Sequence, residues 1–125
     1  MDNNSNAISW FEIPVENMDR AIKFYKTIFD IEFNMWENNE SLMAVFPSGK
    51  GKVGGALVKE KALDPSRNGN MIYLNANPDL KIITDRLEQA GGELLTPKMF
   101  IAEGVGFMAY FRDSEGNTIG LHSTK

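Results

Sequence analysis

The chain has 125 residues, no cysteine and a single histidine, and its 13 basic and 17 acidic residues give a net charge of −4. Without cysteine it forms no disulfide, zinc–thiolate or iron–sulfur site, and one histidine cannot supply two imidazoles. The acidic balance argues against nucleic acid as a partner, and no run of 18 apolar residues predicts a membrane helix. The polar N-terminus lacks a signal-peptide pattern, so we expect a cytoplasmic protein of one domain.

The first predicted element is a strand over residues 8–15, followed by a helix. Trp10 and Glu12 share one face of this strand, and the apolar residues that alternate with them share the other. Asn17 is a suitable N-cap for the helix, which we expect to end near Asp30 because aspartate tolerates the left-handed conformation. One stripe at helical spacing is apolar and predicts the buried face: Ala21, Phe24, Tyr25, Ile28 and Phe29.

Three strand-like runs complete the first half, and the pattern then begins again. Residues 61–69, rich in turn-forming residues, are the best candidate for a linker. In the second half, Asn77 as N-cap and Pro78 at the first helical position predict the start of a helix that Gly91 ends. The predicted strands are 31–36, 42–46 and 53–59 in the first half, and 71–75, 93–96, 107–112 and 118–123 in the second.

The order βαβββ therefore occurs twice, which indicates an internal duplication within a single domain of residues 1–125. Module one spans about residues 7–60 and module two about 70–124. Aligning Glu12 with Tyr73 gives an offset of 61 residues (73 − 12), and the same offset brings Glu16 to Asn77 at the two helix entrances.

The duplicated pattern resembles the vicinal oxygen chelate superfamily, which includes glyoxalases, bleomycin resistance proteins and extradiol dioxygenases. The resemblance covers about residues 8–123 and rests on short motifs in matching order: Phe11-Glu12-Ile13-Pro14-Val15, Phe24-Tyr25, Leu87-Glu88-Gln89-Ala90-Gly91-Gly92 and Asp113-Ser114-Glu115-Gly116-Asn117. It implies an α+β fold in which two tandem βαβββ modules form an open, U-shaped, barrel-like mixed sheet around a cleft, with the helices packed outside.

Metal enzymes of that superfamily place one ligand on the first and one on the last strand of each module. By position, these places correspond here to Trp10, Gly55, Met71 and Gly120. None of these side chains offers the oxygen or imidazole donor that a divalent cation needs. The resemblance therefore implies a member of the superfamily that has neither the usual metal ligands nor a cofactor. The alternative is a divalent metal at a shifted site.

Candidate site residues follow from the same comparison. Glu12, Tyr73 and His122 each lie two residues beyond a ligand position, so their side chains point to the same face as that position. They are candidates for holding a polar ligand group or for moving a proton. The alternative for each is a solvated or hydrogen-bonded residue without a role, which for a lone histidine near the end of the chain is the more common case. Trp10 and Phe107 complete the predicted ligand-binding set as aromatic contacts for a flat or apolar molecule.

We expect a protein that binds a small apolar or aromatic molecule in its cleft without a metal. Residues 99–106, apolar and with two glycines, are either a lid over that cleft or an ordinary loop. The alternative is an enzyme of the same fold (a lyase, isomerase or dioxygenase-like protein) that uses Glu12 as a base, or a shifted metal site built on Glu12 and His122. A third is a partner domain without a ligand. The resemblance also implies a homodimer, in which one cleft is built from one chain or from two.

Overall fold

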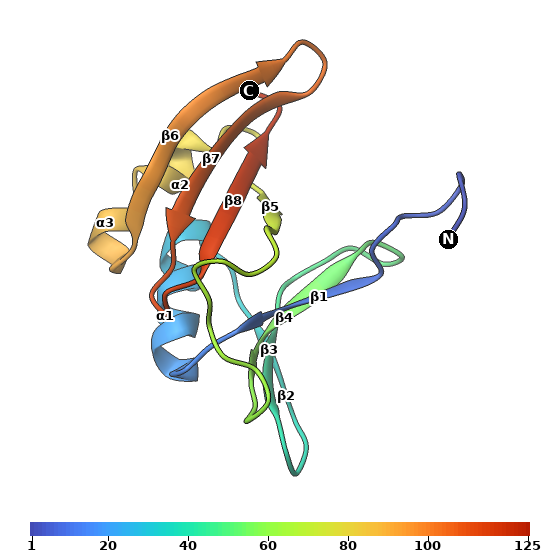
Figure 1. Cartoon of the computed structure of the whole chain (residues 1–125), viewed down its shortest axis with the longest axis vertical. Coiled ribbons are helices and arrows are strands. Elements are labelled where there is room, and N and C mark those ends of the chain that lie inside the picture. Colours follow the sequence, from blue (N-terminus) through green and yellow to red (C-terminus); the bar gives the residue numbers. More distant parts are fainter.

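The computed structural model describes residues 1–125 and contains two four-stranded sheets (Figure 1). The first has the order β1-β4-β3-β2 and the second β5-β8-β7-β6. In each sheet the first strand in sequence runs parallel to the last, and the other pairs are antiparallel. The sheets stay separate, so the predicted open, mixed α+β arrangement of two repeats is confirmed. The strands are β1 (Trp10–Pro14), β2 (Asn34–Glu37), β3 (Leu42–Val45), β4 (Gly54–Lys59), β5 (Tyr73–Asn75), β6 (Glu93–Ala102), β7 (Gly106–Arg112) and β8 (Thr118–Ser123).

Helix α1 (Met18–Phe29) forms as its sequence predicts. The Asn17 side chain accepts a hydrogen bond from the backbone N–H of Arg20 at 3.0 Å, which satisfies a free donor of the first turn. Asp30 ends the helix in the left-handed conformation, with φ 54° and ψ 54°. The buried stripe is the predicted one with Met18 added and Phe29 half-buried: Met18, Ala21, Phe24, Tyr25 and Ile28.

The second helical segment starts later than predicted, because Asn77 does not cap it. The Asn77 side-chain oxygen instead accepts a hydrogen bond from the backbone N–H of Thr124 at 2.8 Å and holds the C-terminal end of the chain. Helix α2 (Lys81–Thr84) follows. Leu80 is the N-cap of α2, and its side chain makes no cap hydrogen bond. The carboxylate of Asp79, one residue earlier, accepts a hydrogen bond from the backbone N–H of Lys81 at 2.9 Å.

A break at Asp85 and Arg86 separates α2 from α3 (Leu87–Ala90), where a single helix was expected. The Arg86 guanidinium donates a hydrogen bond to the backbone carbonyl of Ile28 at 3.1 Å, in the last turn of α1. Arg86 thereby satisfies a carbonyl that has no partner within its own helix. The apolar stripe survives the break, because Leu80, Ile83 and Leu87 are all buried.

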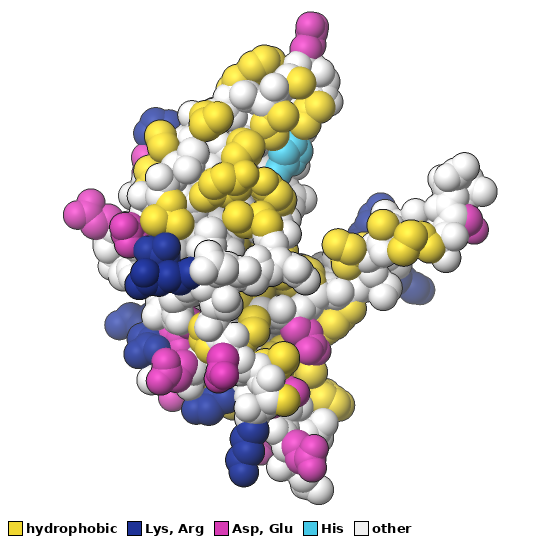
Figure 2. Space-filling view, viewed as in Figure 1, with side chains coloured by type: hydrophobic (Ala, Val, Ile, Leu, Met, Phe, Trp, Pro, Cys, Tyr) yellow, Lys and Arg dark blue, Asp and Glu magenta, His cyan; other side chains and the backbone are white.

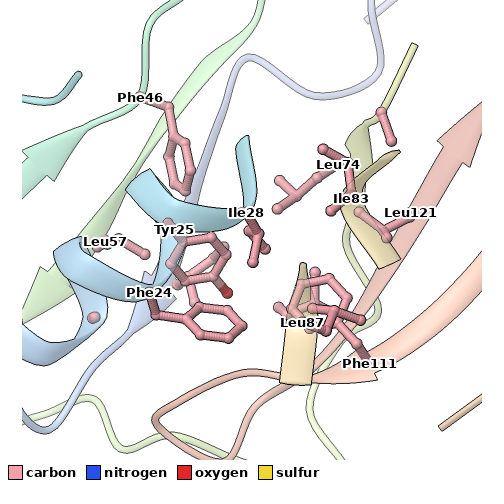
Figure 3. Packing of buried hydrophobic residues seen from close by; sticks show 14 of the residues in the cluster. Phe24, Tyr25, Ile28, Phe46, Leu57, Leu74, Ile83, Leu87, Phe111 and Leu121 are labelled. Carbon is pink, nitrogen blue, oxygen red and sulfur yellow. The ribbon is translucent and has the colours of Figure 1, made fainter. Parts of the chain in front are cut away.

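The helices and both sheets share one hydrophobic core, with α1 at its centre (Figure 3). Phe24 packs against Phe111 of β7 with ring centroids 5.9 Å apart, and Tyr25 packs against Phe46 beside the first sheet at 5.6 Å. Each sheet therefore has one face covered by the helices. We call the opposite faces the free faces.

A turn of the second repeat, residues 113–117, holds the start of α1 through a buried polar network. The Glu115 carboxylate accepts hydrogen bonds from the backbone N–H of Asn17 at 2.6 Å and from Nε of Arg20 at 2.7 Å. Burial alone would raise the pKa of Glu115, but these donors outweigh it and hold that pKa below its usual value. The Tyr25 hydroxyl donates to Asp113 at 2.7 Å, and burial together with this carboxylate raises the pKa of Tyr25 well above its usual value.

The segment 99–106 is not a loop or a lid, but the end of β6, a tight turn and the start of β7. Met99 lies opposite Met108, and Phe100 lies opposite Phe107. The register of β6 shifts at three places, and each shift interrupts the alternation of faces. The apolar pattern therefore has no clear period, so the sequence predicts a strand only up to residue 96, whereas β6 continues to Ala102.

No helix of the structure is long and apolar enough to cross a membrane.

Candidate ligand-binding site

Trp10 and Glu12 lie side by side on the free face of the first sheet, as the period of two predicts. The indole Nε1 donates a hydrogen bond to Oε2 of Glu12 at 3.3 Å, and Trp10 is 43% exposed. Glu12 forms no ion pair with a basic residue. The pair therefore presents an oriented carboxylate beside an exposed aromatic ring.

Tyr73 lies across Gly120 on the free face of the second sheet. The two residues are register partners in β5 and β8, and a Cβ placed on Gly120 would lie 2.6 Å from the Tyr73 ring. The hydroxyl oxygens of Tyr73 and Tyr110 are 2.7 Å apart. This hydrogen bond, with partial burial, raises the pKa of Tyr73 above its usual value.

His122 is on the same sheet, where its register partner is Met108 of β7. Its Nε2 lies 2.7 Å from the backbone oxygen of Val105, so the ring donates to the turn between β6 and β7. No hydrogen bond joins Glu12 to Tyr73 or His122. The three predicted polar residues thus form separate local contacts, and the predicted set lacks Tyr110, which alternation along β7 places on the free face.

Phe107 does not join the other predicted ligand contacts. It alternates with Met108 along β7 and pairs with the buried Ser123, so it lies on the covered face. There its ring centroid is 4.5 Å from the ammonium of Lys98 and 5.5 Å from the ring of Phe100. An alternating strand places Phe107 and His122 on opposite faces of the sheet, so the two cannot contact one ligand on the free face.

The four positions implied as metal ligands do not fit a divalent cation. The register pairs Trp10 with Gly54 and Phe11 with Gly55, so the assignment of Gly55 to the face of Trp10 is wrong. A Cβ on Gly55 would lie 2.4 Å from the Phe11 ring, on the covered side. Gly55 and Gly120 have no side chain that could bind a metal ion, and the Tyr73 ring occupies the space beside Gly120. Met71 offers only a thioether, which suits soft ions rather than a hard divalent cation. No three His, Cys, Asp or Glu side chains are placed to hold a metal ion.

A cavity of about 890 Å³ lies between the first sheet and β5. Ten of its 17 lining residues are hydrophobic, and Phe11, Phe29 and Phe46 supply aromatic surface. Tyr73 is the only member of the predicted ligand-binding set that lines it. Sequence reasoning missed this cavity because its walls come from distant segments. They are residues 46–49, 52–55 and 71–75 together with Ile8, Phe11, Phe29 and Ile31.

A second cavity, of about 760 Å³, is polar in character. It lies between the β2–β3 turn, the segment after β4 and Glu115, and six of its 14 lining residues are acidic while three are hydrophobic. The two cavities thus differ in chemistry, and the one beside β5 suits an apolar molecule.

Comparisons with known proteins agree with this fold. A glyoxylase-like domain-containing protein from Didymella fabae is 30% identical over 114 residues, which cover 89% of this chain and 88% of that protein. The crystal structure of a glyoxylase/bleomycin resistance protein/dioxygenase domain from Frankia superimposes with a TM-score of 0.69 at 18% identity, over 97% of this chain and 99% of that one. A fosfomycin resistance protein from Listeria monocytogenes superimposes with a TM-score of 0.64 at 20% identity, over 97% and 92% of the two chains. The family model for the Glyoxalase/Bleomycin resistance protein/Dioxygenase superfamily matches residues 7–121, and the chain belongs to this superfamily.

Proposed function

We propose that the protein binds a small apolar or aromatic molecule, without a metal, in the cavity between the first sheet and β5. The observation that carries this proposal is the cavity itself, with a volume of about 890 Å³ and a mainly hydrophobic lining. Sites for small molecules have volumes of about 300–1,000 Å³ and are mostly apolar with a few polar groups.

The aromatic wall of the cavity supports a flat or apolar ligand. The ring centroids of Phe11 and Phe46 are 5.7 Å apart, and those of Phe33 and Phe46 are 4.8 Å apart. Packing of this kind holds the rings in place, so little side-chain freedom is lost when a ligand binds. Gly55 contributes by leaving room for the Phe11 ring directly above its backbone.

The test is a titration followed in amide ¹H–¹⁵N spectra, with a set of small aromatic and aliphatic compounds. We expect binders to shift the amides of residues 46–55 and 71–75, because these line the cavity. Val53→Trp places an indole at a half-buried lining position, and we expect it to weaken binding by about tenfold or more. Val105→Trp, at an exposed position in the β6–β7 turn, is the control and should leave binding unchanged.

Two results would contradict the proposal. One is that no compound class shifts those amides. The other is that shifts appear instead around Trp10, Tyr110 and His122 and are insensitive to Val53→Trp. Elemental analysis of protein purified without chelator addresses the metal, and more than about half an equivalent of a transition metal would refute metal-independent binding.

An enzyme is the second candidate, and the Trp10–Glu12 pair favours it. The indole N–H orients a carboxylate that no basic residue neutralises, and such a group can take a proton from a carbon next to a carbonyl and return one from solvent. In D₂O this step exchanges hydrogen for deuterium, which ¹H NMR of small ketones detects. Glu12→Gln should slow exchange by about a hundredfold, whereas Glu37→Gln, on the exposed β2, should not. Equal rates for wild type and Glu12→Gln would exclude this role.

We also propose that two copies of the chain form a homodimer through the free faces. In Figure 2 hydrophobic side chains gather over β6, β7 and β8, beside the single histidine. Large apolar residues are about half exposed on the first sheet as well, where Trp36 is 52% exposed. Exposed apolar surface of this kind is typical of interfaces, and paired subunits are the commonest symmetric assembly.

A further inference from the structure

The apolar cavity has a pronounced charge bias. Lys52 is the only charged residue among its 17 lining residues, and none of the 17 acidic residues of the chain reaches it. The polar cavity of similar size carries six acidic residues. In a chain with a net charge of −4, a cavity whose single charge is positive favours an anionic group.

One cationic donor in the turn that leads into β4, the Lys52 ammonium, has no partner within the chain. It forms no ion pair. Lys52 lines the cavity and is exposed, so it belongs to the solvent side of the cavity. Phe11 and Phe46 line the same cavity with apolar surface.

We infer that the ligand of this cavity is a small amphipathic carboxylate, an inference that rests on the proposed function. Its aromatic or aliphatic body packs against Phe11 and Phe46, and its carboxylate accepts a charge-assisted hydrogen bond from Lys52. A carboxylate placed at the solvent side keeps part of its hydration, so it avoids the large cost of burying an unpaired charge.

The probes are two ligands of nearly the same shape, naphthalene-2-carboxylate and the neutral naphthalene-2-carboxamide. Both are titrated into the full chain and followed by the amides of residues 46–55 and 71–75. We expect the carboxylate to bind about fivefold or more tightly than the carboxamide, with an advantage that shrinks in high salt. Lys52→Met keeps the aliphatic stem and should remove this advantage, while Lys52→Arg should keep it. Lys50→Met is the matched control, because Lys50 is exposed in the same turn but does not line the cavity.

The outcomes separate this inference from the proposed function. If the two probes bind with equal affinity, or if Lys50→Met and Lys52→Met have the same effect, the carboxylate inference is overturned while an apolar site remains. If neither probe shifts these amides, the proposed function fails as well. If the amides instead shift with protein concentration alone, a second copy of the chain occupies the cavity, and the inference is again overturned. Tighter binding of the carboxylate that only Lys52→Met abolishes supports it.

Discussion

At the scale of single residues, the contact between Tyr73 and Gly120 decides what the free face of the second sheet offers. The absence of a Cβ at position 120 lets the Tyr73 ring lie against the β8 backbone and reach the Tyr110 hydroxyl. A side chain at position 120 and the ring in its present place exclude each other. The glycine at position 120 therefore accounts for two features of this face: it has no side chain that could bind a metal, and it leaves room for Tyr73 to reach Tyr110.

Gly120→Ala should destabilise the protein by about 1–3 kcal/mol, because the new Cβ would lie 2.6 Å from the Tyr73 ring. In a Tyr73→Ala background the space is free, and the cost should fall below about 0.5 kcal/mol. Urea unfolding of the four proteins in this cycle measures both values. Gly69→Ala is the control, since its nearest neighbour would be 3.6 Å away. An equal cost of Gly120→Ala in both backgrounds would refute the overlap.

At the scale of elements, the turn at residues 113–117 and the start of α1 form one structural unit across the two repeats. The Glu115 carboxylate serves the free backbone donors at the helix start, where the helix dipole also favours a negative charge. The Asn117 side chain donates to the carbonyl of Pro14 at 2.8 Å and joins the end of β1 to the same unit. These hydrogen bonds fix the position of the first repeat relative to the second.

Glu115→Gln should cost about 1.5–3 kcal/mol at pH 7, because a buried, charge-assisted set of hydrogen bonds loses its charge. The pKa of Glu115 is lower in the folded protein than its usual value of 4.5, so the carboxylate adds stability above that pH. This contribution is lost as the pH falls through the folded pKa.

Urea unfolding between pH 7 and pH 3 therefore should show a steeper acid loss for the wild type than for Glu115→Gln. Glu93→Gln is the matched control: Glu93 pairs with Arg112 at 3.4 Å, but its side chain is 67% exposed, and the change should cost less than about 0.5 kcal/mol. Identical pH profiles for wild type and Glu115→Gln would mean that the charge of Glu115 does not stabilise the fold.

At the scale of the whole molecule, the free faces carry apolar surface that the chain does not cover itself. Sedimentation should therefore give twice the mass of the 14.0 kDa chain. Trp36→Glu should shift the protein toward the monomer, because it places a charge on the free face. Met35→Glu is the control, since Met35 is equally exposed at 52% but points to the opposite face of β2. A monomeric wild type, or equal effects of both changes, would contradict assembly through this face.

Local patterns in the sequence predict much of the fold, and the failures have identifiable causes. Helix α1 follows its cap and its apolar stripe, because both act within a few residues. Asn77 looks like a cap but bonds to Thr124, 47 residues away, and no local pattern contains that contact. The assignment of Gly55 fails because one residue of register in β4 changes the face, and register depends on the partner strand. Phe107 shows the same dependence in β7.

Periodicity and turn chemistry predict the α+β class and the repeated order of elements, because both are properties of short segments. Tertiary packing places Tyr73 over Gly120, turns Phe107 toward the helices and forms the cavity between the first sheet and β5. The walls of that cavity come from residues scattered between positions 8 and 55 and from residues 71–75, and only packing brings these segments together. A site formed between segments so far apart has no periodic signal, and only the contacts of the folded chain define it.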